Sequence, residues 1–183
     1  MLAMKRVYEG KGWTAGPHVF VAPDGIWVFT PVNKQGIGVV GHNEHAIHVE
    51  IVGNYEENKL EGVMRRNALD AFAAICLWLN YDPMNLCFHR DYANTMCPGR
   101  HIATTFKLHV MFNIFRHEAA KRIGIEPIRI NEDAALYKYA QGNNVGAPLT
   151  NEFPCCGYIV QGFAQRFLSA KKGEWSDVTE RMW

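Results

Sequence analysis

An imidazole and a thiol eight positions apart are the clearest candidates for chemistry in this sequence. His89 and Cys97 lie in one short polar stretch, and Pro98 and Gly99 turn the backbone directly after the thiol. A neutral imidazole and a thiolate are ordinary zinc ligands, and a loop of this length can fold both onto one ion. Taken alone, the pair also fits a surface histidine and a buried free cysteine, because short motifs often match by chance.

A carboxylate upstream of this pair is the second candidate. Residues 47–52 alternate in the manner of a β-strand, which places His48, Glu50 and Val52 on one face. A carboxylate in the middle of an otherwise apolar strand is costly to bury without a partner. We therefore expect Glu50 to face a polar cleft.

Three stretches carry a resemblance when they are taken together. The first contains Gly12-Trp13, Gly16-Pro17-His18 and Asp24-Gly25; the second contains Gly41, Asn43, Ile47, Glu50, Gly53 and Asn54; the third contains His89-Arg90-Asp91, Thr95 and Cys97-Pro98-Gly99. In this order and combination they resemble the zinc-dependent N-acetylmuramoyl-L-alanine amidases, the group that includes phage-type amidase endolysins and the peptidoglycan recognition proteins. The resemblance covers residues 5–102.

The resemblance implies a fold and a reaction. The fold is α/β, with a mixed central sheet flanked by helices. The reaction is hydrolysis of the amide between N-acetylmuramic acid and L-alanine in peptidoglycan, by water that a Zn²⁺ ion activates. The resemblance assigns the metal to His89 and Cys97, general-base catalysis to Glu50, a hydrogen bond to the oxyanion to Thr95, and the substrate cleft to His18 and Asn43.

Two departures from the family pattern affect this assignment. The family's first zinc ligand is a histidine on a strand that would lie before Met1, and the tyrosine of its Gly-Tyr-His-Phe motif is Pro17 here. Catalytic zinc usually has three protein ligands. Loss of a strand from the sheet also leaves an edge to be filled, for which a partner chain is one candidate.

His48 is the candidate that the sequence offers for this gap. It stands where the family has a glycine, and it shares a strand face with Glu50. It would either supply the third zinc ligand or fill the space of the absent strand; the alternative is an imidazole at a wet sheet edge, hydrogen-bonded to water. His42 and His45 are weaker candidates, because a three-residue spacing on an extended chain alternates faces.

Composition limits the classes of function. The 183 residues carry a formal net charge of +1, which gives no reason to expect nucleic acid or an anionic membrane as partner. No run of eighteen apolar residues occurs, and Lys5 and Arg6 interrupt the start of the chain, so we expect neither a membrane span nor a signal peptide. Five cysteines, two of them adjacent, indicate synthesis in a reducing cytoplasm. The family resemblance implies action at the bacterial cell wall and a phage or bacterial origin. Export by another route is the alternative.

Periodicity and turn signals predict the elements that position these residues. We expect the tail of a helix over residues 3–11, a hairpin of strands 18–21 and 26–31, and helices over 62–79 and 102–121. The predicted domains are an amidase-like domain, residues 1–124, and a small C-terminal module, residues 135–183, joined by a linker. The module is either a wall-binding unit or a packing extension.

Three functions remain open at this point. The first is a peptidoglycan amidase. The second is a catalytically impaired module of the same fold that binds peptidoglycan or forms part of a larger assembly such as a phage particle. The third is that the chain is a piece of a longer protein.

Overall fold

The computed structural model describes residues 2–102 and 105–183 and divides the chain into two compact units. The first unit comprises the residues up to Phe72 together with Cys87–Phe106, and the second comprises Ala73–Leu86 with Lys107–Trp183. This division differs from the expected one at residues 124–135. The reason is that helix α3 (Phe106–Ala120) packs with the C-terminal strands, through Phe112 and Phe115 against Phe167.

The first unit contains a mixed three-stranded sheet, which confirms the expected class of fold. Strands β1 (Val19–Ala22) and β2 (Gly25–Val28) form an antiparallel hairpin, and β3 (Val49–Ile51) pairs with β1 in parallel, in the order β2-β1-β3. The predicted hairpin is therefore present. Its second strand ends earlier than expected, because beyond it the Thr30 hydroxyl is bonded to the backbone of Gly16.

The register of this sheet places one row of side chains on a common face. Phe20 is paired with Trp27 on one side and with Glu50 on the other. Directly paired residues point to the same face of a sheet. The alternate residues Val19 and Val21 are buried on the opposite face. Glu50 therefore lies on the face of Phe20 and Trp27, away from the valine face.

The helices that precede Lys121 follow the sequence closely. Helix α1 (Leu2–Gly10) corresponds to the helix expected over residues 3–11, and α2 (Gly62–Leu79) has the predicted limits. The Asn67 side chain donates to the carbonyl of Ala22, which ties α2 to the end of β1. Helix α3 begins at Phe106 instead of Ile102; Ala103 and Thr104 lie outside the described residues.

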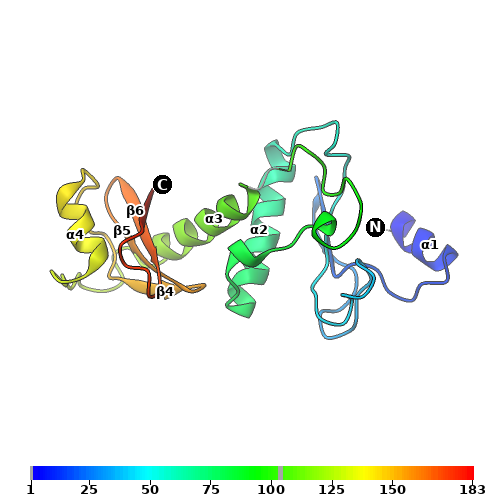
Figure 1. Cartoon of the computed structure of the whole chain (residues 1–183), viewed down its shortest axis with the longest axis horizontal. Helices are drawn as coiled ribbons and strands as arrows, with labels where there is room; N and C mark the ends of the chain where they lie inside the picture. The colour runs from blue at the N-terminus through cyan, green and yellow to red at the C-terminus, as the bar shows by residue number, and fades with distance from the viewer. Residues whose placement is uncertain (1, 103–104) are drawn as a thin grey trace. The chain divides into compact units, whose positions relative to one another are not determined.

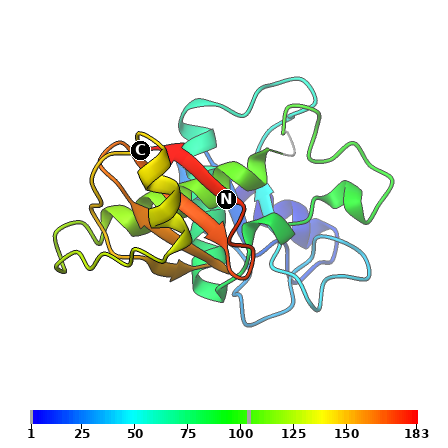
Figure 2. The ribbon, with the colours of Figure 1, turned by 60° about the vertical axis from the view of Figure 1, so that its left-hand side comes forward.

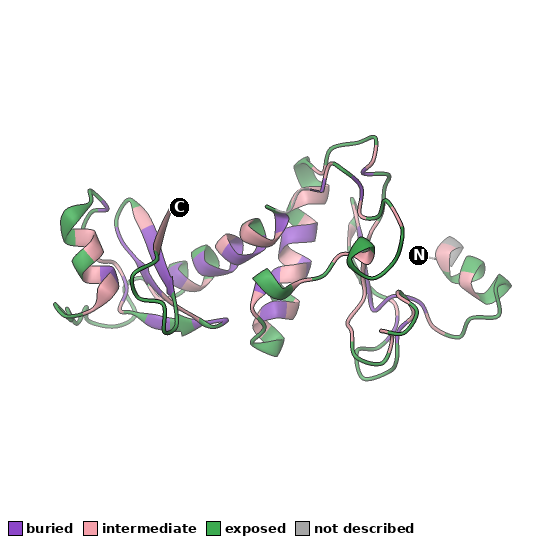
Figure 3. Ribbon diagram, in the orientation of Figure 1, coloured by how far each residue is buried: buried purple, intermediate pink, exposed green. Residues whose placement is uncertain are grey.

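The second unit is a four-stranded antiparallel sheet with a helix on each face. Helix α4 (Ala135–Gly142) precedes strands β4 (Phe153–Cys155), β5 (Tyr158–Gly162), β6 (Arg166–Lys171) and β7 (Val178–Met182). Figures 1 and 2 show α4 on one side of this sheet and α3 on the other. Both faces of β6 are therefore covered, and its residues from Phe167 to Ala170 are all buried (Figure 3).

Two further properties bear on the sequence expectations. Among the helices of the described residues, none is both long and apolar enough to cross a membrane. All five cysteines are described and are free thiols, with Cys76, Cys155 and Cys156 buried.

Candidate active site

Glu50 projects from β3 into contact with a tyrosine of the N-terminal helix. The Tyr8 hydroxyl donates a hydrogen bond of 3.2 Å to Oε2 of Glu50. The Tyr8 ring packs against Trp13 and Phe29, with ring centroids 5.5 Å apart in both cases. Burial, followed by the charge of Glu50 and the hydrogen bond to it, raises the pKa of Tyr8 to about 12. Tyr8 therefore remains a hydrogen-bond donor to the carboxylate throughout the neutral pH range.

The loop that carries His89 and Cys97 is closed by its own backbone. A 3-10 turn over His89–Asp91 begins the loop, and the amide of Arg90 donates to the carbonyl of Cys97 at 3.1 Å. The Thr95 hydroxyl oxygen accepts a hydrogen bond of 3.2 Å from the amide of Cys97. These two bonds fix the backbone of Cys97 beside the start of the turn that carries His89.

Gly99 docks this loop against the chain that follows β3. Its φ of 97° lies in the left-handed region, and a Cβ at this position would be 2.3 Å from the carbonyl carbon of Tyr55. The next two amides complete the contact: Arg100 donates to Glu56 Oε2 at 2.9 Å, and His101 donates to the carbonyl of Tyr55 at 3.0 Å. Only glycine allows so close an approach with this backbone conformation.

The docked loop brings Cys97 into the electrostatic field of Glu50. Burial raises the pKa of the Cys97 thiol; the Glu50 carboxylate raises it further, and Arg90 opposes the shift. A thiol in this setting favours the protonated form. A bound cation would reverse that preference, because metal ligation stabilises the thiolate.

His48 presents an imidazole nitrogen with no partner in the protein. Its Nε2 is buried and forms no hydrogen bond with any described residue. Burial lowers the pKa of His48, and the nearby His18 and His89 imidazoles lower it further. The neutral imidazole is the form that binds metals. Gly38 leaves room for this ring, since a Cβ there would be 2.3 Å from Nδ1 of His48.

His18 and Asn43 were expected at the substrate cleft, and the structure shows both engaged within the protein. His18 is 2% exposed; its Nδ1 accepts from the amide of His48 and its Nε2 lies 3.0 Å from the carbonyl of Lys34. Because Nδ1 accepts a backbone N–H, the ring proton belongs on Nε2, which donates to that carbonyl. Asn43 Oδ1 accepts from the amides of Gly38 and Val39 at 3.0 Å. The His18 side chain therefore joins the connection between β2 and β3 to the sheet at Lys34, and the Asn43 side chain closes that connection on itself.

The imidazole nitrogens of His48 and His89 and the sulfur of Cys97 are atom types that bind zinc. His48 precedes β3, and His89 and Cys97 lie on the loop after α2. The His89 imidazole contributes to the lowered pKa of His48, and the Glu50 carboxylate contributes to the raised pKa of Cys97. Within residues 2–102 and 105–183, no three His, Cys, Asp or Glu side chains converge closely enough to hold a metal ion. The unpartnered Nε2 of His48 is the observation that most favours a ligand at this place.

A groove of about 930 Å³ adjoins this region. It is lined by α1, the turn after it, β2 and the residues following β2, and Tyr8, Trp13, Trp27 and Lys34 are among its walls. Tyr8 connects the groove to Glu50, because it lines the groove and its hydroxyl donates a hydrogen bond to Glu50. Trp27 lies in the same row across the sheet as Glu50.

Comparison with known proteins agrees with the motifs. Among solved structures, the chain is similar to N-acetylmuramoyl-L-alanine amidase LysC from Clostridium intestinale URNW, with a TM-score of 0.52 and 22% identity over 60% of this chain and 72% of that one. At this identity the likeness concerns the fold. No curated protein matches the chain. Residues 3–100 match the N-acetylmuramoyl-L-alanine amidase family, and since this segment spans more than half of the 183 residues, the chain belongs to that family.

Proposed function

We propose that this chain is a zinc-dependent peptidoglycan amidase that hydrolyses the amide between N-acetylmuramic acid and L-alanine. The observation that carries the proposal is the convergence of β3 and the loop after α2. The pair His48 and Glu50 on the strand interacts with the pair His89 and Cys97 on the loop. A carboxylate, two imidazoles and a thiol carried by two neighbouring segments are the types of group that metal-assisted hydrolysis uses.

We assign the metal to His89, Cys97 and His48. When bound, zinc supplies Lewis acidity toward a carbonyl and lowers the pKa of water to about 7. His48 brings the third ligand, and the second imidazole nitrogen, to this set from the position directly before the strand that carries Glu50. Its neutral form and its unpartnered Nε2 support the assignment.

Glu50 moves the proton in this proposal. Its carboxylate accepts a proton from the attacking water and delivers it to the leaving nitrogen of L-alanine. Tyr8 holds Oε2 by its hydrogen bond, which leaves Oε1 to face the reacting atoms. The Thr95 oxygen already accepts from Cys97, and in this proposal its O–H donates to the developing oxyanion. A neutral hydroxyl stabilises this charge less than an ammonium would.

The second candidate function is a catalytically impaired module that binds peptidoglycan or forms part of a larger assembly. Two observations favour it: three metal-binding side chains do not converge in the described parts of the chain, and Pro17 replaces a hydroxyl-bearing tyrosine of the family motif. In this case β3, whose pairing among the described strands is with β1 alone, would offer its other edge to a partner chain.

An assay of bond cleavage separates the two functions. Purified bacterial peptidoglycan is incubated with the zinc-loaded chain, and new amino-terminal L-alanine is measured together with zinc content. We expect release by the wild type and a loss of about 10²- to 10⁴-fold in Glu50→Gln, the range for removal of a general base. Glu57→Gln, which removes an exposed carboxylate from the same unit, should retain activity. Wall binding without zinc and without release would establish the second function instead.

A further inference from the structure

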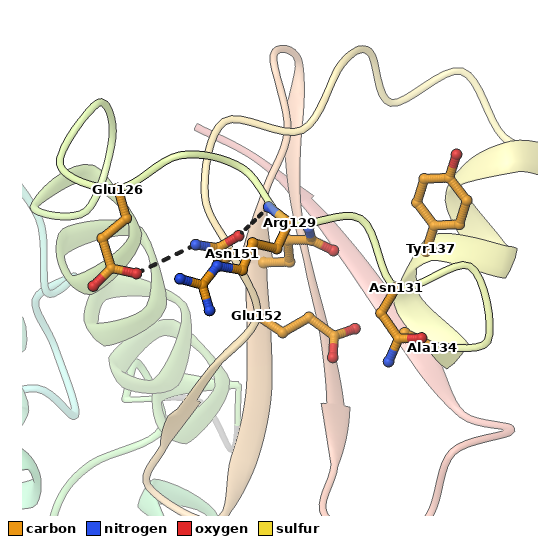
Figure 4. A pocket seen from close by; sticks show the side chains of 8 residues that line it. Glu126, Arg129, Asn131, Ala134, Tyr137, Asn151 and Glu152 are labelled. Carbon is orange, nitrogen blue, oxygen red and sulfur yellow. Dashed lines mark hydrogen bonds between the residues drawn. The ribbon is translucent and has the colours of Figure 1, made fainter.

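A second candidate binding site lies entirely within the second unit. It is a pocket of about 290 Å³ between the segment that precedes α4, the first turn of α4, the residues before β4 and one residue of β5 (Figure 4). Its lining residues are Glu126, Arg129, Asn131, Ala134, Tyr137, Asn151, Glu152 and Gln161. None of them belongs to the unit that holds Glu50, His89 and Cys97.

One wall of the pocket is built by Asn151. Its Oδ1 accepts a hydrogen bond of 2.7 Å from the amide of Arg129, and its Nδ2 donates to Glu126 Oε2 at 3.3 Å (Figure 4). The same Nδ2 also donates to the carbonyl of Pro127 at 3.1 Å. These three bonds hold an otherwise irregular segment against the residues before β4. Arg129 and Glu126 are therefore carried by a fixed backbone.

A buried acceptor without a partner lies among the lining residues. Gln161 is 4% exposed, and its Nε2 donates to the carbonyl of Thr150 at 3.0 Å. Thr150 is itself held, because its hydroxyl oxygen accepts from the amide of Gly162. The orientation of the Gln161 amide is thus determined, and its Oε1 is left without a hydrogen bond among the described residues. Buried acceptors normally have a partner, so this one marks a place for a donor from outside the chain.

Two opposite charges line the same pocket without pairing. The guanidinium of Arg129 and the carboxylate of Glu152 form no ion pair with each other or with any other described side chain. Burial raises the pKa of Glu152, as expected for a carboxylate that loses water and gains no cation. Both residues line the pocket, and in Figure 4 the guanidinium of Arg129 extends toward the Glu126 side and the carboxylate of Glu152 toward the Asn131 side.

These charges limit the class of ligand. A simple anion would meet the carboxylates of Glu152 and Glu126, and a simple metal cation would meet the guanidinium of Arg129. A ligand with both an ammonium group and a carboxylate can pair with Glu152 and with Arg129, while Glu126 keeps its hydrogen bond from Asn151. The volume lies at the lower end of ligand pockets, about 300–1,000 Å³, which favours a ligand of a few residues.

We propose that this pocket binds the end of a short zwitterionic peptide, with its ammonium group on Glu152, its carboxylate on Arg129 and an N–H donor on Gln161. The guanidinium can bind a carboxylate through two parallel hydrogen bonds. Tyr137 offers an apolar ring to the peptide side chain. Stem peptides freed from peptidoglycan and free dipeptides both belong to this chemical class. The inference depends on the pocket alone and not on the proposed amidase activity.

The test is an NMR titration of the full chain with L-alanyl-L-alanine and with two capped forms, the N-acetyl dipeptide and the dipeptide amide. We expect saturable shifts for the free dipeptide, and a loss of affinity of about tenfold or more with either cap, because each cap removes one charge-assisted contact. A stem tetrapeptide that binds more tightly than the dipeptide would identify peptidoglycan fragments as the source.

Two single variants test separately which end of the peptide Arg129 binds and which end Glu152 binds. Arg129→Gln should remove the preference for a free carboxylate, and Glu152→Gln the preference for a free amine. Glu132→Gln and Lys172→Gln, exposed charges outside the pocket, are the matched controls and should bind as the wild type does.

Two outcomes would overturn the proposal. One is the absence of saturable shifts at about 10 mM dipeptide, a concentration that detects a Kd of about 1 mM. The other is equal binding of the free and capped forms. Repeating the titration with Glu50→Gln keeps this result separate from the amidase assay, since binding in the second unit should survive loss of the base in the first.

Discussion

The Tyr8 hydroxyl donates to Glu50 across 42 positions of sequence, at 3.2 Å. The contact depends on the packing of α1 over the face of the sheet that carries Phe20, whose ring centroid lies 6.4 Å from that of Tyr8. Gly16 makes room for this packing, because a Cβ there would lie 2.7 Å from the Phe29 ring and 3.2 Å from the Tyr8 ring. The N-terminal helix is thereby part of the candidate active site.

Tyr8→Phe should change the stability of the protein at alkaline pH. The pKa of Tyr8 is raised to about 12 in the folded chain, above its ordinary value of 10.0. A group whose folded pKa is raised contributes stability below its unfolded pKa and loses that contribution as the pH rises toward the folded value. The free energy of unfolding of the wild type should therefore fall between pH 10 and pH 12, and that of the variant should fall less. Denaturant titrations at several pH values measure this; equal slopes for both proteins would contradict it.

Gly99→Ala should destabilise the first unit more than Gly41→Ala. Both glycines have φ in the left-handed region, 97° and 81°. A Cβ on Gly99 would also meet the backbone of Tyr55 and Glu56 at 2.3 and 2.6 Å, whereas nothing lies within 4 Å of one on Gly41. Strain alone costs about 1–3 kcal/mol, so Gly41→Ala measures that cost and any excess in Gly99→Ala measures the clash. Thermal unfolding measures the loss of stability in both variants. Equal losses would show that the loop moves to accommodate the Cβ of Gly99→Ala without further cost.

His48→Gly should weaken zinc binding. Removal of a direct ligand should cost more than the 10- to 100-fold associated with partners that only orient a ligand. His45→Gly removes an exposed imidazole from the preceding loop and is the matched control. Competition with a chelating dye measures the affinity, and circular dichroism without metal verifies that both variants fold. Unchanged zinc affinity in His48→Gly would leave His89 and Cys97 as the assigned ligands.

Phe167→Ala should strongly destabilise the second unit. The ring is 1% exposed and contacts the rings of Phe112, Phe115 and Trp183. Truncation of a buried phenylalanine costs about 3–5 kcal/mol, including the cavity that remains. Ile125→Ala, at a side chain that is 70% exposed, should change stability by less than about 0.5 kcal/mol. Similar small effects at both positions would mean that the helix and the sheet do not share this core.

Local patterns in the sequence were sufficient to predict the helices and strands whose formation is determined by neighbouring residues. The hairpin was predicted from Pro23-Asp24-Gly25, and α2 was predicted with its observed limits from a 3.6-residue period. Its apolar residues Ala68, Phe72, Ile75 and Leu79 recur at helical spacing and predict one buried stripe; Ala68 is fully buried, whereas Leu79, in the last turn, is 48% exposed. Cys76, which was not placed on this stripe, is also fully buried, and a small residue of this kind gives a weak periodic signal.

Contacts between distant residues explain what the sequence did not show. Helix α3 was expected from Ile102, but the segment before it is bonded to the chain after β3 through His101 and Tyr55. The strands of the second unit were not predicted one by one, because β6 is buried on both faces and so lacks alternation. Tyr8 belongs to none of the sequence motifs described above, and its place beside Glu50 results from the packing of α1.

The in-register pairing of Phe20 with Glu50 sets a rule for insertions and deletions in β3. Side chains on a strand alternate with a period of two, so a gain or loss of one residue here would turn both His48 and Glu50 to the valine side of the sheet. A change of two residues would keep the face but move the carboxylate along the strand by about 6–7 Å. Length variation among relatives should therefore accumulate in the loop before His48, while β3 itself keeps a constant length.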